Sequence, residues 1–148
     1  MNTPFIHLRT LSSYSLSESA LKINDLIKLA KKNNMPAIAI TDNNNMFGVF
    51  EFALECFNNG IQPIIGTSIN LLDVSYKDKI SQLSFLVKSE LGYKNLLHLS
   101  SLSHTSNNNN VGLYLKDFKK YSEGLYCYIG GEYNPLLLLN LDNKNKKI

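Results

Sequence analysis

The sequence predicts an α/β fold in which mainly parallel strands are joined by crossover helices, and three observations lead to this prediction. The first is the continuous apolar run at residues 37–40, which is typical of a strand buried on both faces of a parallel sheet. The second is helical apolar spacing on either side of that run, over residues 22–33 and 46–58. The third is another short apolar run at residues 61–66, which completes a strand–helix–strand unit expected to be right-handed.

The elements of the first half follow from local patterns. Residues 5–10 form an apolar run that ends in the polar loop 12–15, and we expect a first strand there. The helix at 22–33 carries apolar residues at positions i, i+3, i+4 and i+7, with lysines on the opposite side. Gly60 is a typical C-cap for the helix at 46–58.

The second half continues with shorter elements. The patterns predict, in order, a strand at 82–88, a helix at 89–103, a short helix at 115–121, a strand at 125–129 and the start of a helix at 136–141. A loop is expected at the asparagine run 107–110, and a sharp turn at the glycine pair 130–131.

Composition indicates one globular domain at residues 1–141, followed by a polar, lysine-rich tail at 142–148. No apolar run approaches the ~20 residues that span a bilayer, and no secretory signal is visible, so we expect a cytoplasmic protein without membrane contact. The tail lysines account for the net charge of +3. Arg9 is the only arginine, so the chain has no arginine-rich surface for reading nucleic acid.

The cysteines and two of the histidines carry no recognisable chemistry. Cys56 and Cys127 match no metal or redox spacing, and both are predicted to be buried free thiols. His98 falls on the polar stripe of its helix and is therefore predicted to be solvated. His104 borders the asparagine run without a partner that the sequence identifies.

The candidate site lies where the first two predicted strands end in polar loops. The carboxyl ends of parallel strands meet at one edge of a sheet, which is where α/β proteins place their chemistry. His7, within the first strand, is interpreted as a core or rim histidine. Asp42, just after the second strand, is interpreted as the cap of the helix that begins near residue 46 and not as a catalytic group.

Four sequence blocks resemble a known family. They are residues 5–16, residues 35–48, residues 60–66, and residues 92–103 together with 121–125. In their order and in their residue patterns, these blocks resemble the amino-terminal PHP domain (polymerase and histidinol phosphatase type) of bacterial DNA polymerase III alpha subunits. The fourth block is unlike the small stand-alone phosphatases of the wider family, and the resemblance extends over nearly the whole chain.

The resemblance implies a distorted (β/α)7 barrel, of which this chain would form a little over half, so the expected fold is a partial PHP-type barrel. Active members hold two or three divalent metal ions with histidines and carboxylates, and the metals activate water for attack on a phosphoester. The DNA-directed polymerase site, with its Mg²⁺, would lie far beyond residue 148. The fragment alone is therefore predicted to be inactive and to need no cofactor.

The family's metal-ligand positions are degenerate in this chain. They fall on Arg9, Leu11, Glu18, Asn43 and Ser68. Leucine cannot coordinate a metal, arginine carries a positive charge, and the amide and hydroxyl are weak ligands, so only Glu18 remains competent. We therefore predict no catalytic residue and no bound metal. One hypothesis is that Arg9 replaces the lost metal charge by pairing with Glu18 or Asp42.

Three functions remain open from the sequence. The first is a metal-free, non-catalytic scaffold and docking domain of a replicative polymerase subunit. Its expected partners are the remainder of the alpha subunit and the proofreading exonuclease subunit, with DNA reached only through the full-length protein. The second is a metal-dependent PHP phosphoesterase or proofreading nuclease. The third is a stand-alone remnant of a split polymerase gene.

Overall fold

The computed structural model describes residues 5–76, 79–105, 110–130 and 134–136. Four predictions lie wholly or partly outside these residues and are not followed further. They are the asparagine loop 107–110, the turn 130–131, the helix 136–141 and the tail 142–148. The predicted domain boundary at residue 141 also lies outside the described residues.

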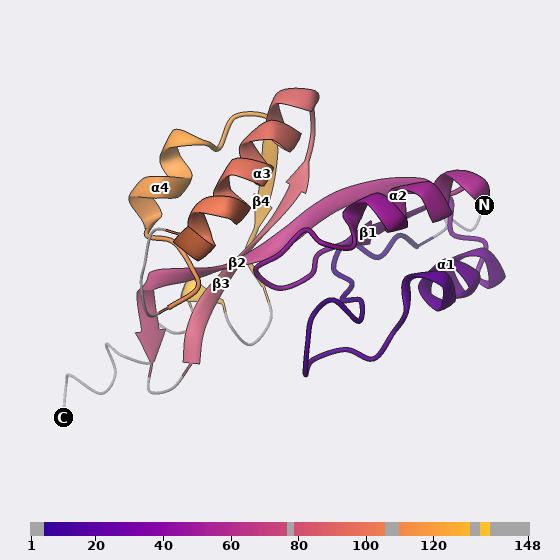
Figure 1. Ribbon diagram of the computed structural model, residues 1–148, viewed down its shortest axis with the longest axis horizontal. Helices are drawn as coiled ribbons and strands as arrows, with labels where there is room; N and C mark the ends of the chain where they lie inside the picture. Colours follow the sequence, from indigo (N-terminus) through magenta and orange to yellow (C-terminus); the bar gives the residue numbers. More distant parts are fainter. Residues whose placement is uncertain (1–4, 77–78, 106–109, 131–133, 137–148) are drawn as a thin grey trace.

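Helices and strands alternate in the first half of the described chain, whereas in the second half two strands and then two helices follow one another (Figure 1). In order they are α1 (Ile23–Lys32), β1 (Ala37–Ile40), α2 (Val49–Asn58), β2 (Gln62–Tyr76), β3 (Lys79–Val87), α3 (Glu90–Thr105), α4 (Leu115–Lys120) and β4 (Leu125–Tyr128). The α/β class is confirmed, and each predicted helix among these residues is present. Gly60, with φ of +66°, follows α2 in the left-handed conformation expected of a residue that ends a helix.

The described strands form one sheet in the order β1-β2-β3-β4. β1 pairs with the first part of β2 in parallel, whereas β2–β3 and β3–β4 are antiparallel. The expectation that the strands are mainly parallel is therefore wrong for this part of the chain. The reason is that β2 runs on far beyond residue 66 and only two residues separate its end from the start of β3, which is too short a link for a crossover between parallel strands.

The predicted strand at residues 5–10 is not a regular strand, although residues 7–10 do run alongside β1. The Ala39 amide donates to the His7 carbonyl at 2.9 Å, and the Thr41 amide donates to the Thr10 carbonyl at 2.8 Å. The Thr10 amide donates to the Thr41 side-chain hydroxyl at 3.0 Å instead of a backbone carbonyl, which interrupts the ladder. The segment is thus an irregular parallel neighbour of β1.

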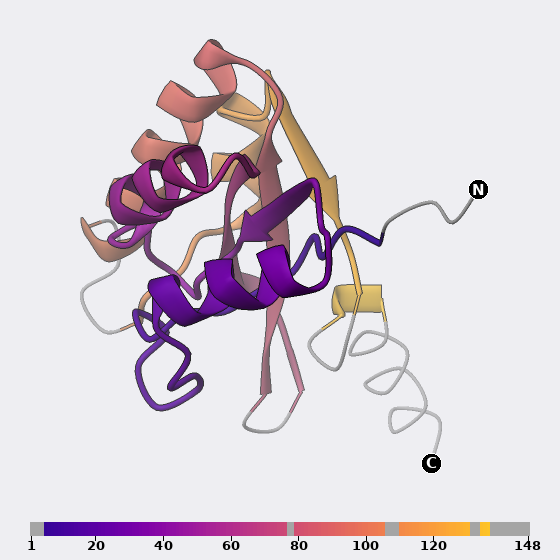
Figure 2. The same ribbon diagram turned by 90° about the vertical axis from the view of Figure 1, so that its right-hand side faces the viewer.

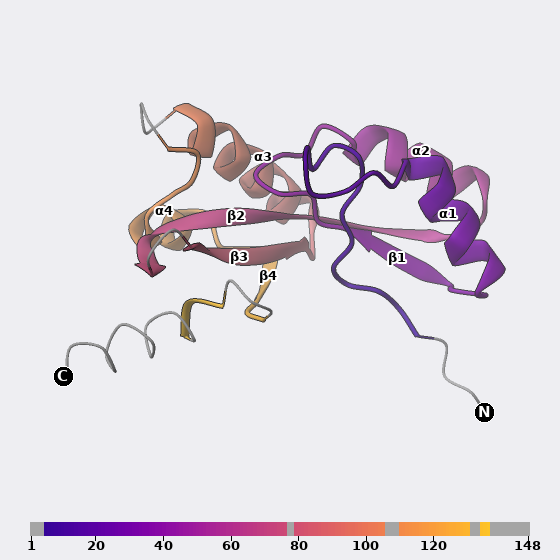
Figure 3. The ribbon, with the colours of Figure 1, turned by 90° about the horizontal axis from the view of Figure 1, so that it is seen from below.

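The helices α1, α2 and α3 cover one face of the sheet (Figures 2 and 3). Two buried apolar clusters hold this layer together, one between α1, α2 and β1 and one between α3, α4, β2 and β3. The other face carries an apolar groove of about 480 Å³. It is lined by Leu8, Ile64, Leu86, Val87, Tyr126, Cys127 and Tyr128. Among the described residues, none of the helices combines the length and the hydropathy of a membrane-spanning segment.

Candidate functional site

Asp42, directly after β1, is the centre of a buried hydrogen-bond network. Its carboxylate accepts hydrogen bonds from the Ser12 amide (2.7 Å), the Ser12 hydroxyl (2.6 Å) and the Ser15 hydroxyl (2.6 Å). The predicted role of Asp42 as a helix cap is wrong, because α2 begins only at Val49 and its N-cap, Gly48, makes no side-chain capping bond. Asp42 instead fixes the loop that follows the amino-terminal segment.

Thr67 and Asn45 complete the connection between the loops. The buried Thr67 hydroxyl lies 2.7 Å from the Asp42 carbonyl and 2.9 Å from the Asn45 carbonyl. The Asn45 side chain donates to the carbonyls of Tyr14 (3.1 Å) and Asn43 (2.9 Å). Apart from the bond from Asn45 to Asn43, which lies within one loop, these contacts join the segments of the site to one another and fix the arrangement of the polar loops.

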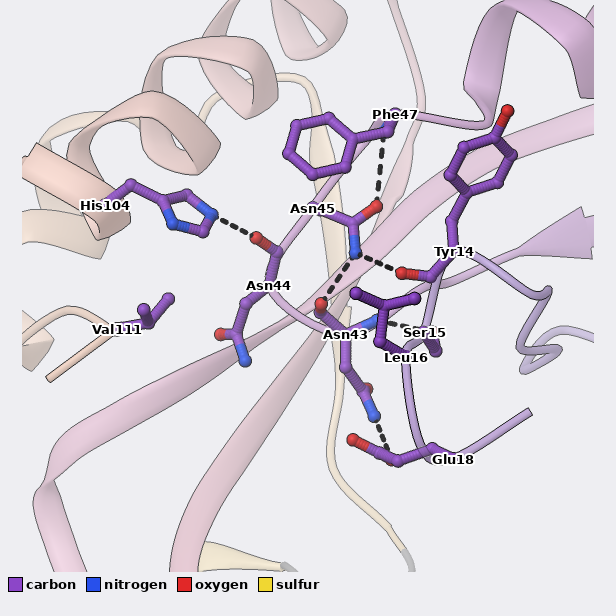
Figure 4. A pocket seen from close by; sticks show the side chains of 10 residues that line it. All are labelled: Tyr14, Ser15, Leu16, Glu18, Asn43, Asn44, Asn45, Phe47, His104 and Val111. Carbon is purple, nitrogen blue, oxygen red and sulfur yellow. Dashed lines mark hydrogen bonds between the residues drawn. The ribbon is translucent and has the colours of Figure 1, made fainter. Parts of the chain in front are cut away.

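These loops enclose a hollow with a volume of about 320 Å³ (Figure 4). It is lined by Tyr14, Ser15, Leu16, Glu18, Asn43, Asn44, Asn45, Phe47, His104 and Val111. Although it stands where the sequence predicts a polar site, large apolar side chains form several of its walls. Three of the five degenerate ligand positions are at or beside this hollow, and two are not.

The three that the structure brings together are Glu18, Asn43 and Ser68. The Glu18 carboxylate accepts a hydrogen bond from the Asn43 side-chain amide. The backbone of Asn43 forms an isolated parallel bridge with Ser68. Ser68 is fully buried, and its hydroxyl lies 2.8 Å from that of Ser84. The Ser68 hydroxyl and one Glu18 oxygen are thus engaged within the protein, whereas the buried side-chain oxygen of Asn43 has no hydrogen-bond partner.

Arg9 and Leu11 do not line this hollow. The Arg9 guanidinium is exposed and lies 3.5 Å from the side-chain oxygen of Gln82. The hypothesis that Arg9 pairs with Glu18 or Asp42 is wrong, since neither ion pair is among those formed by the described residues. The Leu11 carbonyl accepts a hydrogen bond from the Ser19 hydroxyl at 3.0 Å, and its side chain is half-buried.

The three histidines differ in how closely their environments in the structure match the predictions from the sequence. His7 is exposed at the rim of a second hollow of about 280 Å³, with its ring edge-on to Phe5, so it is a rim and not a core residue. His98 is exposed as predicted, and its ring centroid lies 4.3 Å from that of Tyr121. His104 was missed: its Nε2 lies 2.6 Å from the Asn44 carbonyl and ties α3 to the hollow.

The side chains at the hollow do not fit a PHP-type metal cluster. Such a cluster needs several histidines and carboxylates pointing at common ions. The described residues contain no group of three or more histidine, cysteine, aspartate and glutamate side chains that could hold a metal ion. Among the described residues that line the hollow, Glu18 is the single carboxylate, and one of its oxygens accepts a hydrogen bond from Asn43.

Two other titratable groups are perturbed near the site and in the core. The Tyr14 hydroxyl donates to Glu51 at 3.0 Å, and this hydrogen bond, followed by the negative charge of Glu51, raises the pKa of Tyr14. Burial raises the pKa of the Cys56 thiol to about 12, and its predicted burial is confirmed. The predicted burial of Cys127 is wrong, because β4 has a strand neighbour on one side only among the described strands and the thiol is exposed.

Comparison with known proteins gives a family match over most of the chain. A family model described as PHP domain matches residues 7–148. The chain is 44% identical over 144 residues to DNA polymerase III subunit alpha of Rickettsia conorii, covering 93% of this chain and 12% of that protein. It is 42% identical over 161 residues to the same subunit of Borreliella burgdorferi, covering 96% of this chain and 14% of that protein. The chain therefore spans about an eighth of the length of these relatives.

The chain is also similar, at a lower level, to solved structures. An amidohydrolase from Chromobacterium violaceum, with bound sulfate and no metal, has a TM-score of 0.48 and 18% identity over 66% of this chain and 32% of that one. A putative metal-dependent phosphoesterase from Bifidobacterium adolescentis has a TM-score of 0.47 and 17% identity with the same coverage.

Proposed function

The chain belongs to the PHP domain family, and from this premise we propose that it is the amino-terminal portion of a DNA polymerase III alpha subunit. Within that subunit it acts as a metal-free, non-catalytic scaffold and docking domain. DNA replication is then the work of the whole subunit, whose Mg²⁺-dependent polymerisation site lies outside these residues. The similarity to polymerase subunits over 93% of the chain supports the first part of this proposal.

One observation carries the non-catalytic part. At the five positions where the family collects metal ligands, this chain offers a single carboxylate, Glu18, which accepts a hydrogen bond from the Asn43 side chain, while the Ser68 hydroxyl is engaged with Ser84. The buried side-chain oxygen of Asn43 has no hydrogen-bond partner, but one carboxylate and one neutral amide oxygen are too few ligands for a cluster of two or three metal ions. Water activation by a metal cluster therefore has no support from the side chains at the hollow.

The proposed partners follow from the same premise. The remainder of the alpha subunit is the first, because the relatives are about eight times longer than this chain. The proofreading exonuclease subunit is the second, and DNA is reached only through the full-length protein. The proposed location is the cytoplasm, where a bacterial replication protein works.

The experiment that tests the proposal is a metal and activity measurement on the purified chain. After dialysis against a weak chelator, elemental analysis is expected to find no stoichiometric zinc, manganese or iron. Addition of these metals is expected to give no hydrolysis of p-nitrophenyl phosphate above background. One or more tightly bound equivalents, or metal-dependent hydrolysis, contradicts the proposal and favours the phosphoesterase.

A second measurement addresses the scaffold role in the whole subunit. Primer extension by the full-length polymerase is expected to be unchanged in the Glu18→Gln and Asn43→Ala variants, because neither side chain takes part in chemistry. A loss of extension or of exonuclease activity in folded variants contradicts the scaffold role. A genome in which no polymerase reading frame continues after residue 148 favours the split-gene remnant.

A further inference from the structure

α2 presents a row of large apolar side chains to solvent. Phe50, Leu54 and Phe57 follow one another at intervals of four and three residues, and they are 80%, 48% and 82% exposed. On an α-helix this spacing places side chains in one stripe along the axis. The opposite side of α2 is already buried, with Phe52 and Cys56 in the core, so the stripe is not needed to attach the helix. An apolar stripe of this kind marks an interaction surface.

The stripe leads to the hollow of the candidate site. Phe47 stands in the turn immediately before α2, is 72% exposed, and lines the hollow (Figure 4). Leu16, which is 82% exposed, and Val111 form other parts of the same lining. We call Leu16, Phe47, Phe50, Leu54 and Phe57 the apolar track. With about 320 Å³, the hollow at its start has room for one large apolar side chain.

The charge of α2 selects among possible occupants. Its charged residues are Glu51 and Glu55, and residues 49–58 contain no lysine or arginine. A partner with basic residues beside its apolar stripe would complement this charge. A second copy that packs α2 against α2 in a symmetric contact would instead bring like charges together.

We infer that the apolar track docks an amphipathic helix with basic flanks, contributed by the part of the polymerase subunit that lies outside these 148 residues. One large apolar side chain of this helix occupies the hollow, where ligand chemistry has been lost. The inference rests on the proposed function, because the partner helix belongs to the longer polymerase subunit of which this chain is proposed to be a part. The contact spans residues 47–57, so at 1.5 Å per residue the partner helix needs roughly 15 Å, or about three turns.

Hydroxyl-radical footprinting of the whole subunit, folded and unfolded in urea, tests whether the track is covered. The labelling of Phe47, Phe50 and Phe57 is expected to be severalfold lower in the folded subunit. Leu29, an exposed residue on α1 outside the track, is the internal reference and is expected to change less. Equal labelling of the three phenylalanines in both states overturns the inference. It leaves the proposed function standing, because that depends on metal content and on the reading frame.

A cross-linking arm identifies the occupant. With p-benzoylphenylalanine in place of Phe57, the whole subunit is expected to cross-link within one polypeptide, to a helix with lysines or arginines beside its apolar residues. In the whole subunit, the double variant Phe50→Asp and Phe57→Asp is expected to keep the circular dichroism spectrum of the parent, since both side chains are exposed in the described chain, and to lose the protection of Phe47. Cross-links to residues 1–148 of another copy, to a separate protein or to DNA overturn the inference, as does the absence of any cross-link.

Discussion

At the scale of single residues, the sequence supports predictions about residue chemistry better than predictions about contacts. The residue types at Leu11 and Ser68 are enough to predict that ligand chemistry is missing there, and this stays a prediction. The contacts that replace it depend on segments far apart in the chain. Asp42 was misread as a helix cap because its true donors, Ser12 and Ser15, precede it by about thirty residues and carry no local signal. His104 was missed for the same reason.

Asp42 is expected to be the residue of the site on which stability depends most. In the Asp42→Ala variant, the buried hydroxyls of Ser12 and Ser15 lose their acceptor, which should cost about 2 to 4 kcal/mol. The measurement is the midpoint of urea unfolding followed by circular dichroism. Asp25→Ala is the matched control, because the exposed Asp25–Lys28 pair at 3.5 Å should contribute less than about 1 kcal/mol. Equal effects of the two changes contradict the structural role of Asp42.

The two thiols are expected to differ in reactivity. Burial raises the pKa of both thiols, that of Cys56 to about 12, so the reactive thiolate of Cys56 is scarce at pH 8; in addition, Cys56 is fully buried, whereas Cys127 is exposed to the reagent. Iodoacetamide should therefore modify Cys127 alone in the folded chain and both cysteines in urea, as read by mass spectrometry. Because the folded pKa of Cys56 lies above the unfolded one, its contribution to stability is full below pH 9 and declines between about pH 9 and pH 12. Rapid modification of Cys56 in the native chain contradicts this placement.

At the scale of elements, the helices and β1 were predictable because their apolar periodicity is complete within each segment. The β2–β3 hairpin was not, although part of its signal was present. Ile69 and Leu71 alternate with polar residues and continue β2 beyond residue 66, so that the chain returns as a hairpin where a crossover helix was expected. A regular strand was predicted for the amino-terminal segment because its residue pattern is typical of one. In the structure, the Thr10 amide donates to the Thr41 side-chain hydroxyl and not to a backbone carbonyl, so the strand ladder is interrupted.

The packing of α3 against the turn before β4 is expected to depend on Gly92. A Cβ at this position would lie 1.8 Å from the Gly124 carbonyl oxygen, and a backbone neighbour cannot easily move away. Gly92→Ala is therefore expected to destabilise the chain by about 3 kcal/mol or more. Gly130→Ala is the control, because nothing lies within 4 Å of its Cβ and its unfolding midpoint should barely change. A Gly92→Ala variant as stable as the control would show that α3 does not approach the turn this closely.

At the scale of the whole molecule, the sequence predicted the α/β class and the family, and both are confirmed, although the described strands are not mainly parallel. What it could not predict is which face of the sheet remains open. Helices α1, α2 and α3 cover one face, while the other presents the apolar groove that contains Ile64 and Tyr126. The Tyr128 hydroxyl donates to the Leu8 carbonyl at 2.8 Å, so the two ends of the described chain meet across this face without filling it.

The isolated chain is expected to be poorly stable on its own. The groove and the apolar track leave large side chains such as Phe57 and Tyr126 exposed, at 82% and 57%. Burial contributes roughly 25 cal/mol per Å², so a few hundred Å² left in water forfeits several kcal/mol, which is comparable to the whole stability of a domain. We therefore expect the chain to self-associate or to melt with weak cooperativity, and to be rescued by the rest of the subunit. Light scattering and calorimetry measure both properties. A stable monomer with one sharp transition would contradict this expectation. It would mean that these residues already bury enough apolar surface to form a stable domain by themselves.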